Sequence, residues 1–299
     1  MLENNPCEDF GLDKFLTYFN LRKADSESTG DIMTTLMAIG GAMNLEEPAI
    51  FEEFIKRAGG AKANIVVLPQ ASSLAQTGKE YSQIFQKLGA KKKPISLEFR
   101  TRTEADQKSH LEVLRRATGI FITGGTQMRL TSLMGGTKFE QELLAAYQRE
   151  AVIAGTSAGT AVQSKIMIAY GRSGATPRER IAQFSSGFGF TDKIIFDQHF
   201  RQRDRLGRLM YAISMHPGVL GVGVDENTAA IVEDDRHITI CGKNAITIVD
   251  GKNIKATNVA EITNSRPIAV SGLTIHVLTE GCSFDMKFRT AIIPHVLAE

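Results

Sequence analysis

The sequence is poor in cysteine and has no excess of charge of either sign. Its three cysteines, Cys7, Cys241 and Cys282, lie far apart and form no Cys-x-x-Cys pair, which argues against a disulfide framework and a zinc cluster. Lysine and arginine number 35 against 33 acidic residues, a formal net charge of +2, so the broad positive surface that nucleic-acid binding requires is missing. We therefore expect reduced cysteines, no nucleic-acid partner and, at most, a local basic site.

Long hydrophobic runs are also missing. No window approaches 18 uninterrupted apolar residues, and the N-terminal MLENNPCEDFGLDKF has no basic segment followed by an apolar one. Neither a transmembrane helix nor a secretory signal is expected from this pattern. With 42% hydrophobic and 23% charged residues, the 299-residue chain has the composition of a globular protein with a sizeable core. We expect a cytoplasmic protein with no membrane partner.

Short apolar runs and helix-like stretches alternate along the first half of the chain. Residues 1–30 are polar and are interpreted as an N-terminal extension, and 31–299 as a single α/β domain. Strands are predicted at 35–39, 64–68, 119–123 and 151–154, and helices at 48–58, 80–88 and 104–117. Such alternation predicts βαβ units and a mostly parallel sheet with helices on both faces.

The pattern of apolar residues changes toward the C-terminus. The segments HITICG, NAITIVDG and LTIHVLTEG are short and apolar at alternate positions, so the β-rich part from about 235 to 299 is predicted to add β-hairpins to the same domain, with Asp250-Gly251 at one turn. The loops that follow the predicted parallel strands are GGA, PQAS, GGTQ and GTSAG. Because the carboxyl ends of parallel strands meet at one edge, these loops are expected to gather there.

The stretch AVIAGTSAGT, residues 151–160, places Ser157 within a Gly-x-Ser-x-Gly pattern. An apolar run that ends in such a motif predicts a strand that turns sharply into a helix and exposes the serine hydroxyl. A side chain at Gly155 or Gly159 is expected to collide with the neighbouring strand or the following helix. The motif alone is equally compatible with a glycine-rich connection and an ordinary capping serine.

A serine nucleophile needs a base and a group that orients the base. His199 ends the apolar run IIFDQHF, whereas the other histidines are interpreted as structural or surface residues: His110, His216, His237, His276 and His295. Asp225 and Glu226 follow a second short apolar run, and either carboxylate is a candidate to orient His199. The resulting order of serine, histidine and acid differs from that of α/β-hydrolases.

Catalysis by serine also requires donors for the oxyanion that forms during attack on a carbonyl. The backbone N–H of Ala158 at the predicted helix start is one candidate, and the Gly124–Gly125 pair offers a second because glycine allows a close approach to substrate. We expect Gly125 and Ala158 to form the oxyanion hole. The amide of Gln127, two residues later, is a candidate for contact with substrate.

Several arginines follow His199 in FRQRDRLGRLM. Arg203, Arg205 and Arg208 are predicted to enter a helix whose apolar residues face the core. Guanidinium groups bind carboxylates in a two-pronged manner, so arginines near a serine nucleophile indicate an acidic substrate. The alternative is a solvated basic face. Asp197 is predicted either to meet a cationic group of the substrate or to hold one of these arginines.

Six segments between residues 36 and 232 resemble the cyanophycinases, in the serine peptidase family that includes the α-aspartyl dipeptidase peptidase E. These segments are LMAIGGA, AGGAKANIVVLPQAS, FITGGTQMRL, AGTSAGTAV, DQHFRQRDRLGRL and GVGVDENTA. The resemblance implies a fold like that of peptidase E and class I glutamine amidotransferases, and a homodimer. It also implies a Ser-His-Glu triad at Ser157, His199 and Glu226.

The same resemblance implies a substrate and a set of residues that contact it. The substrate is cyanophycin, a polyaspartate whose side-chain carboxylates carry arginine in isopeptide linkage, and the product is the β-aspartyl-arginine dipeptide. No metal or organic cofactor is implied. An α-aspartyl or isoaspartyl dipeptidase of the same family is the alternative, and a binding protein that keeps the fold without activity is a more distant one. The substrate-binding positions are Gln127, Asp197, Gln198, Arg203, Arg205 and Arg208.

Overall fold

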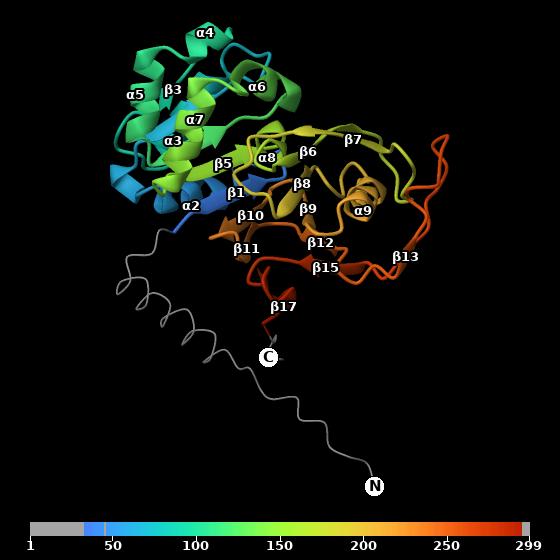
Figure 1. Ribbon diagram of the computed structural model, residues 1–299. Coiled ribbons are helices and arrows are strands. Elements are labelled where there is room, and N and C mark those ends of the chain that lie inside the picture. Colours follow the sequence, from blue (N-terminus) through green and yellow to red (C-terminus); the bar gives the residue numbers. More distant parts are fainter. Residues whose placement is uncertain (1–32, 45, 295–299) are drawn as a thin grey trace.

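The computed structural model describes residues 33–44 and 46–294, in which helices and strands alternate first and strands dominate later (Figure 1). The predicted extension 1–30 and His295 lie outside these residues. The helices are α2 (Ala49–Arg57), the short 3-10 helix η1 (Gly60–Lys62), α3 (Thr77–Lys87), α4 (Arg102–Ala105), α5 (Lys108–Arg116), α6 (Gln127–Met134), α7 (Lys138–Gln148), α8 (Ala158–Ala161) and α9 (Leu206–Met215). In the described ranges, none of the helices has the length and apolar character needed to cross a membrane.

Most of the strands belong to two sheets. They are β1 (Thr35–Ile39), β2 (Ile65–Leu68), β3 (Ile95–Ser96), β4 (Gly119–Ile122), β5 (Val152–Thr156), β6 (Ile166–Gly171), β7 (Ala182–Ser186), β8 (Ile194–Gln198), β9 (Leu220–Val224), β10 (Thr228–Glu233), β11 (His237–Gly242), β12 (Ile246–Asp250), β13 (Ala256–Thr257), β14 (Val270–Ser271), β15 (Thr274–Leu278), β16 (Ser283–Asp285) and β17 (Thr290–Ile292). The larger sheet has the order β17-β16-β11-β10-β1-β5-β4-β2-β3 and the smaller one the order β15-β12-β9-β8.

The larger sheet contains the predicted parallel core. Strands β1, β5, β4, β2 and β3 are parallel neighbours, and β10, β11, β16 and β17 extend this core with antiparallel pairs. The predicted α/β fold, with a mostly parallel central sheet and added C-terminal hairpins, is therefore confirmed. The structure adds a second sheet, in which β8 and β9 are parallel and β12 and β15 antiparallel.

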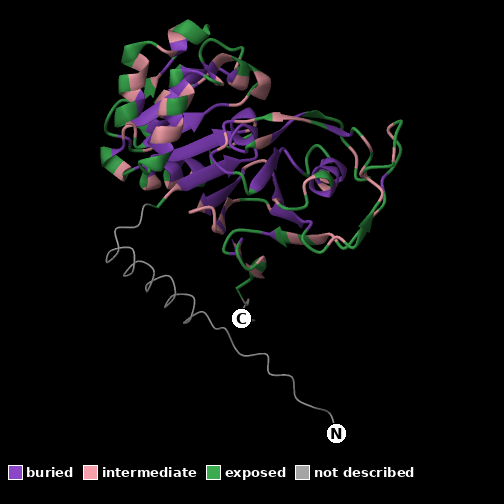
Figure 2. Cartoon of the chain, in the orientation of Figure 1, coloured by how far each residue is buried: buried purple, intermediate pink, exposed green. Residues whose placement is uncertain are grey.

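Helices cover both faces of the parallel core because each buried strand is apolar on both sides. In β1, Leu36 and Ala38 belong to the apolar cluster that includes residues of α5, α6 and α7. Met37 and Ile39 point to the other face, where they join a cluster with α2 and with Phe85 of α3. Figure 2 shows the strands as buried and the outer sides of these helices as exposed. This burial on two faces explains the continuous apolar runs in the sequence.

The helix predicted over 104–117 is interrupted in the structure. Helix α4 ends before Asp106, and Gln107 is extended, with φ −60° and ψ 134°, before α5 begins. The Asp106 carboxylate accepts a hydrogen bond from the backbone N–H of Phe139 at 3.0 Å, in the first turn of α7. The break therefore places a carboxylate at the start of a neighbouring helix, where exposed N–H groups and the helix dipole favour it.

The turn predicted at Asp250-Gly251 is wrong as a hairpin turn. Strand β12 does end at Asp250, but this residue pairs with Thr274 of β15, so residues 251–273 separate the two partner strands. This excursion contains the pair β13-β14 and is joined by a bridge between Arg178 and Pro267 to the connection between β6 and β7. An Asp-Gly pair indicates a local turn, and where the chain next returns to the sheet depends on distant contacts.

Candidate active site

The loops after β1, β2, β4 and β5 meet at the carboxyl edge of the larger sheet, as the sequence predicts. A Cβ atom added at Gly124 would lie 3.3 Å from the Cβ of Ser157, and one at Gly125 would lie 2.0 Å from the carbonyl oxygen of Ala71. Three of the four loops are thus in direct contact. Small residues are needed at these positions because the backbones approach so closely.

Ser157 occupies the sharp turn between β5 and α8. Its φ of 53° and ψ of −107° are unusual for a residue with a side chain, a conformation that costs about 1–3 kcal/mol. A Cβ at Gly155 would lie 2.1 Å from the carbonyl oxygen of Gly159, and a Cβ at Gly159 would lie 2.2 Å from that of Ile122. The predicted collision with the helix and with the neighbouring strand is therefore confirmed, and the turn lifts the serine out of the sheet.

A chain of hydrogen bonds connects Ser157, His199 and Glu226. The Ser157 Oγ lies 2.9 Å from His199 Nε2, and His199 Nδ1 lies 2.6 Å from Glu226 Oε1. Asp225, the other carboxylate that the sequence leaves open, is buried and accepts the backbone N–H of Arg201 at 2.9 Å. Glu226 is therefore the carboxylate that contacts the imidazole.

The register of the smaller sheet brings this histidine and this glutamate together. Strands β8 and β9 are parallel neighbours in which Gln198 lies beside Val224, so His199 and Glu226 both follow at the same edge. The larger sheet is linked to this edge through β1. The N–H of His199 donates to the carbonyl oxygen of Gly40 at 2.7 Å, and the N–H of Ser157 donates to that of Ile39 at 3.0 Å.

Burial and neighbouring charges set the protonation of His199. Burial lowers the pKa of His199 below its usual 6.5, the hydrogen bond with Glu226 opposes this, and the positive charges of Arg203 and Arg205 lower the pKa further. The neutral imidazole is therefore the form present at pH 7. A neutral ring that donates from Nδ1 to a carboxylate carries its free electron pair on Nε2, the atom beside Ser157.

Two polar side chains that the sequence analysis missed hold the backbone of Glu226. Its N–H donates to Gln202 Oε1 at 3.0 Å, and its carbonyl oxygen accepts from Asn244 Nδ2 at 2.7 Å. Gln202 lies within the segment DQHFRQRDRLGRL but is not one of the candidate site residues there, and Asn244 comes from the connection between β11 and β12. No sequence signal predicts these contacts, because they depend on how the two sheets meet.

The backbone N–H groups of Gly125 and Ala158 belong to the segments that follow β4 and β5. Neither donates a hydrogen bond to any residue in the described part of the chain. Gly125 is exposed and has φ +139°, a conformation that favours glycine. Ala158 follows Ser157 at the start of α8. One N–H group in the adjacent loop and one directly after Ser157 are of the kind that stabilises an oxyanion in serine hydrolases.

The arginines after His199 do not form a single exposed surface. Arg205 and Arg208 are buried with Asp197, whose exposed fraction is 1%. Arg208 Nε donates to Asp197 Oδ2 at 2.6 Å, Arg208 Nη2 bonds Oδ1, and Arg205 Nη1 lies 3.4 Å from Oδ1. A solvated basic face is therefore wrong for these two residues. Asp197 holds them, which is one of the two roles predicted for it.

Arg203 differs from its two neighbours because it is exposed. The predicted helix begins only at Leu206, after Arg205 in the N-cap position, so Arg203 lies in the turn between His199 and α9. Burial lowers the pKa of Arg205 to about 10, against the opposing charge of Asp197. Arg203 is thus the arginine of this set that remains accessible to an anionic ligand.

The two glutamines predicted to contact substrate differ in their partners. Gln127 Nε2 donates to the carbonyl oxygens of Ile168 and Ala169 at 3.2 and 2.7 Å, which ties the start of α6 to β6. Gln198 Oε1 lies 3.4 Å from Ser157 Oγ. The serine hydroxyl therefore lies between an imidazole nitrogen and an amide oxygen.

Comparison with known proteins assigns the chain to a family. The profile of peptidase family S51 matches residues 36–240, which include Ser157, His199 and Glu226. The chain belongs to peptidase family S51. It is accordingly a serine-type peptidase.

Relatives that match most of the length of this chain are named cyanophycinases. The enzyme from Synechococcus elongatus is 37% identical over 255 residues, covering 84% of this chain and 79% of its own. The enzyme from Trichormus variabilis is 37% identical over 263 residues, with 87% and 88% covered. A solved peptidase from an acI-B1 Actinobacterium, 21% identical, covers 85% of this chain and 98% of its own with a TM-score of 0.61, which supports the fold.

Proposed function

We propose that this peptidase hydrolyses cyanophycin to β-aspartyl-arginine dipeptides with Ser157 as nucleophile. The observation that carries the proposal is the hydrogen-bonded chain from Ser157 through His199 to Glu226, in a family S51 member whose relatives are named cyanophycinases. Neutral His199 is suited to take the serine proton, and Glu226 holds the ring in the required tautomer.

The proposed reaction has two stages. His199 Nε2 takes the proton of Ser157 Oγ as this oxygen attacks an aspartyl carbonyl of the polymer backbone, and the imidazolium then protonates the leaving amine. The oxyanion is held by the N–H groups of Gly125 and Ala158, each of which contributes about 3 kcal/mol in comparable enzymes. A water activated by His199 then hydrolyses the acyl-enzyme, which releases the dipeptide and restores Ser157.

Roles follow for the residues around the triad. Arg203, which is exposed, is assigned to a free carboxylate of the polymer, because a guanidinium binds such groups in a planar fashion. Arg205 and Arg208, buried on Asp197, are assigned to support Gln198, whose carbonyl oxygen accepts from Arg205. Gln198 and Gln127 are assigned to the substrate-binding wall beside Ser157.

The first experiment compares the products of purified cyanophycin with the native protein and with Ser157→Ala, identified by mass. Dipeptide from the native protein alone is the expected result. Dipeptide from both would reject Ser157 as nucleophile. No dipeptide from either, with cleavage of short α-aspartyl or isoaspartyl peptides by the native protein, would assign the dipeptidase activity instead.

We also propose that the protein acts as a cytoplasmic homodimer. The family resemblance in segments 36–232 is the reason for the dimer, and the unpaired Cys241 and Cys282 fit a reducing compartment. Light scattering on the eluting protein is expected to give twice the chain mass of 32.7 kDa. A mass equal to one chain over a wide concentration range would contradict the dimer.

A further inference from the structure

The guanidinium of the proposed substrate is expected to bind a negatively charged or polar group near Ser157. Each unit of cyanophycin carries a guanidinium, which is best met by a carboxylate in the enzyme. Asp197 is not available for this purpose, because both of its oxygens contact Arg208 and its exposed fraction is 1%. The inference that follows rests on the proposed function, because it takes cyanophycin as the substrate.

A cavity of about 510 Å³ lies beside the proposed oxyanion loop. Its wall includes Gln70 and Ser72, which follow the carboxyl end of β2, and Ala71 between them contacts the oxyanion loop. The carbonyl oxygen of Ala71 accepts the N–H of Thr126 at 3.0 Å and would lie 2.0 Å from a Cβ at Gly125. The lining side chains that carry charge or hydrogen-bonding groups include Gln70, Ser72, Glu98, Arg100, Glu104 and Arg129.

Gln70 lines this cavity and carries a buried acceptor. The residue is 4% exposed, and its Nε2 donates to the carbonyl oxygen of Leu97 at 2.6 Å. That carbonyl requires a donor, which fixes Nε2 on its side and Oε1 on the other. Oε1 has no hydrogen-bond partner among the described residues. A buried acceptor without a partner is costly, and a small movement of the Gln70 side chain toward the cavity would let a ligand N–H supply that partner.

Two carboxylates line the same cavity. Glu98 is exposed, and its Oε1 lies at 3.3 Å from the Ser96 hydroxyl. Glu104 Oε2 accepts the backbone N–H of Arg100 at 2.7 Å and leaves Oε1 for another donor. Arg129 supplies a positive charge, and its guanidinium donates to the carbonyl oxygen of Ser72 at 3.4 Å. A cavity with two carboxylates and two arginines matches a ligand that carries both a guanidinium and a carboxylate.

We propose that this cavity binds the pendant arginine of the polymer unit next to the scissile bond. Gln70 Oε1 and the carboxylates of Glu98 and Glu104 accept the guanidinium N–H groups, and the guanidinium of Arg129 meets the free carboxylate of the same arginine. Because Ala71, which lies between the lining residues Gln70 and Ser72, contacts the oxyanion loop, we place this unit adjacent to the aspartyl carbonyl at Ser157. The site therefore selects arginine-bearing units.

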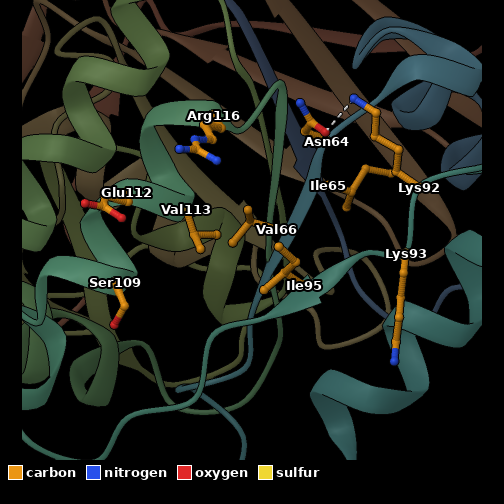
Figure 3. A pocket seen from close by; sticks show the side chains of 10 residues that line it. All are labelled: Asn64, Ile65, Val66, Lys92, Lys93, Ile95, Ser109, Glu112, Val113 and Arg116. Carbon is orange, nitrogen blue, oxygen red and sulfur yellow. Dashed lines mark hydrogen bonds between the residues drawn. The ribbon is translucent and has the colours of Figure 1, made fainter.

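A second cavity of about 500 Å³ serves as the control (Figure 3). Its residues Asn64 and Ile65 come from the amino end of β2, the end opposite to Gln70 and the catalytic edge. Lys92 donates to Asn64 at 3.0 Å, and Glu112 is the carboxylate among the lining residues drawn. Removing the charge of Glu112 changes the net charge of the protein by the same amount as removing that of Glu98, at a distant place.

The test uses Glu98→Gln, the double variant with Glu104→Gln, and the control Glu112→Gln. Synthetic oligomers of three aspartyl-arginine units are compared with oligomers in which citrulline, a neutral isostere, replaces arginine. The double variant is expected to raise KM for the arginine oligomer by about tenfold with kcat within twofold, since two charge-assisted contacts are weakened. For the citrulline oligomer, and for Glu112→Gln with either substrate, KM is expected to stay within twofold of the native value.

The outcomes separate this proposal from the proposed function. Equal KM values for native protein and double variant on the arginine oligomer would overturn the cavity assignment while dipeptide release continues. A fall in kcat without a change in KM would also overturn it, because it would indicate a disturbed oxyanion loop. Absence of dipeptide release by the native protein would instead reject the function on which the proposal rests.

Discussion

Gly41 provides a direct test of how closely the larger sheet contacts the proposed base. A Cβ atom at this position would lie 2.3 Å from His199 Cε1 and 2.5 Å from Nε2, where ordinary contacts begin at 3.4 Å. In Gly41→Ala the imidazole must therefore shift by about 1 Å, and a misplacement of this size costs about 10²-fold in rate. The backbone φ of +106° adds a stability cost of about 1–2 kcal/mol for any residue with a side chain.

Gly89→Ala is the matched control. Gly89 has φ +103°, and no atom lies within 4 Å of the position that a Cβ would take there. Gly89→Ala therefore introduces the same backbone strain as Gly41→Ala but no collision with another side chain. Both variants are expected to lose similar stability in chemical denaturation, whereas Gly41→Ala alone should lose about 10²-fold in the rate at which a serine-directed fluorophosphonate labels Ser157 and in peptidase turnover. Labelling of Gly41→Ala within threefold of Gly89→Ala would refute the reasoning.

Three further predictions concern the charged groups. Glu226→Gln is expected to lower kcat by about 10³-fold, because the imidazole of His199 loses its orienting carboxylate. Asp225→Asn should lower kcat by less than about tenfold. The reverse ranking in steady-state assays would reject Glu226 as the residue that orients His199. Arg203→Gln removes a charge that lowers the pKa of His199, so the acid limb of kcat/KM, which reports protonation of this imidazole, should move to higher pH. Asp197→Asn leaves two buried guanidinium groups without a counter-charge, and urea denaturation should show a loss of about 3 kcal/mol.

The sequence predicts the parallel core of the fold well. The runs at 35–39 and 119–123 correspond to β1 and β4 because a strand buried on both faces must be apolar throughout. The Gly-x-Ser-x-Gly pattern similarly predicts the tight turn at Ser157, since the collisions at Gly155 and Gly159 are local. Features that depend on neighbours in sequence are therefore the ones that pattern analysis recovers.

Features that depend on distant contacts were missed or misjudged. The sequence leaves open whether Arg205 and Arg208 contact substrate, form a solvated face or are held by Asp197, because their burial depends on the carboxylate of Asp197 from the preceding strand. The separation into two sheets leaves no periodic signal, because β8 and β9 are as apolar as the strands of the larger sheet. Likewise, the sequence does not show that Gln70 Oε1 lacks a partner, because this depends on the hydrogen bond between Gln70 Nε2 and the distant carbonyl oxygen of Leu97.

The carbonyl groups at the end of β1 have a consequence for how this scaffold can change. Ile39 accepts the N–H of Ser157 and Gly40 accepts that of His199, so one short backbone segment fixes the spacing of the two residues that are proposed to exchange a proton. The walls of the neighbouring cavity come from other loops, among them residues 69–75 and 98–100. If the proposed assignment of this cavity holds, substitutions at its exposed lining residues change the peptides that are accepted, while the distance between Ser157 and His199 stays constant. Engineering of new specificities should begin with them and leave β1 untouched.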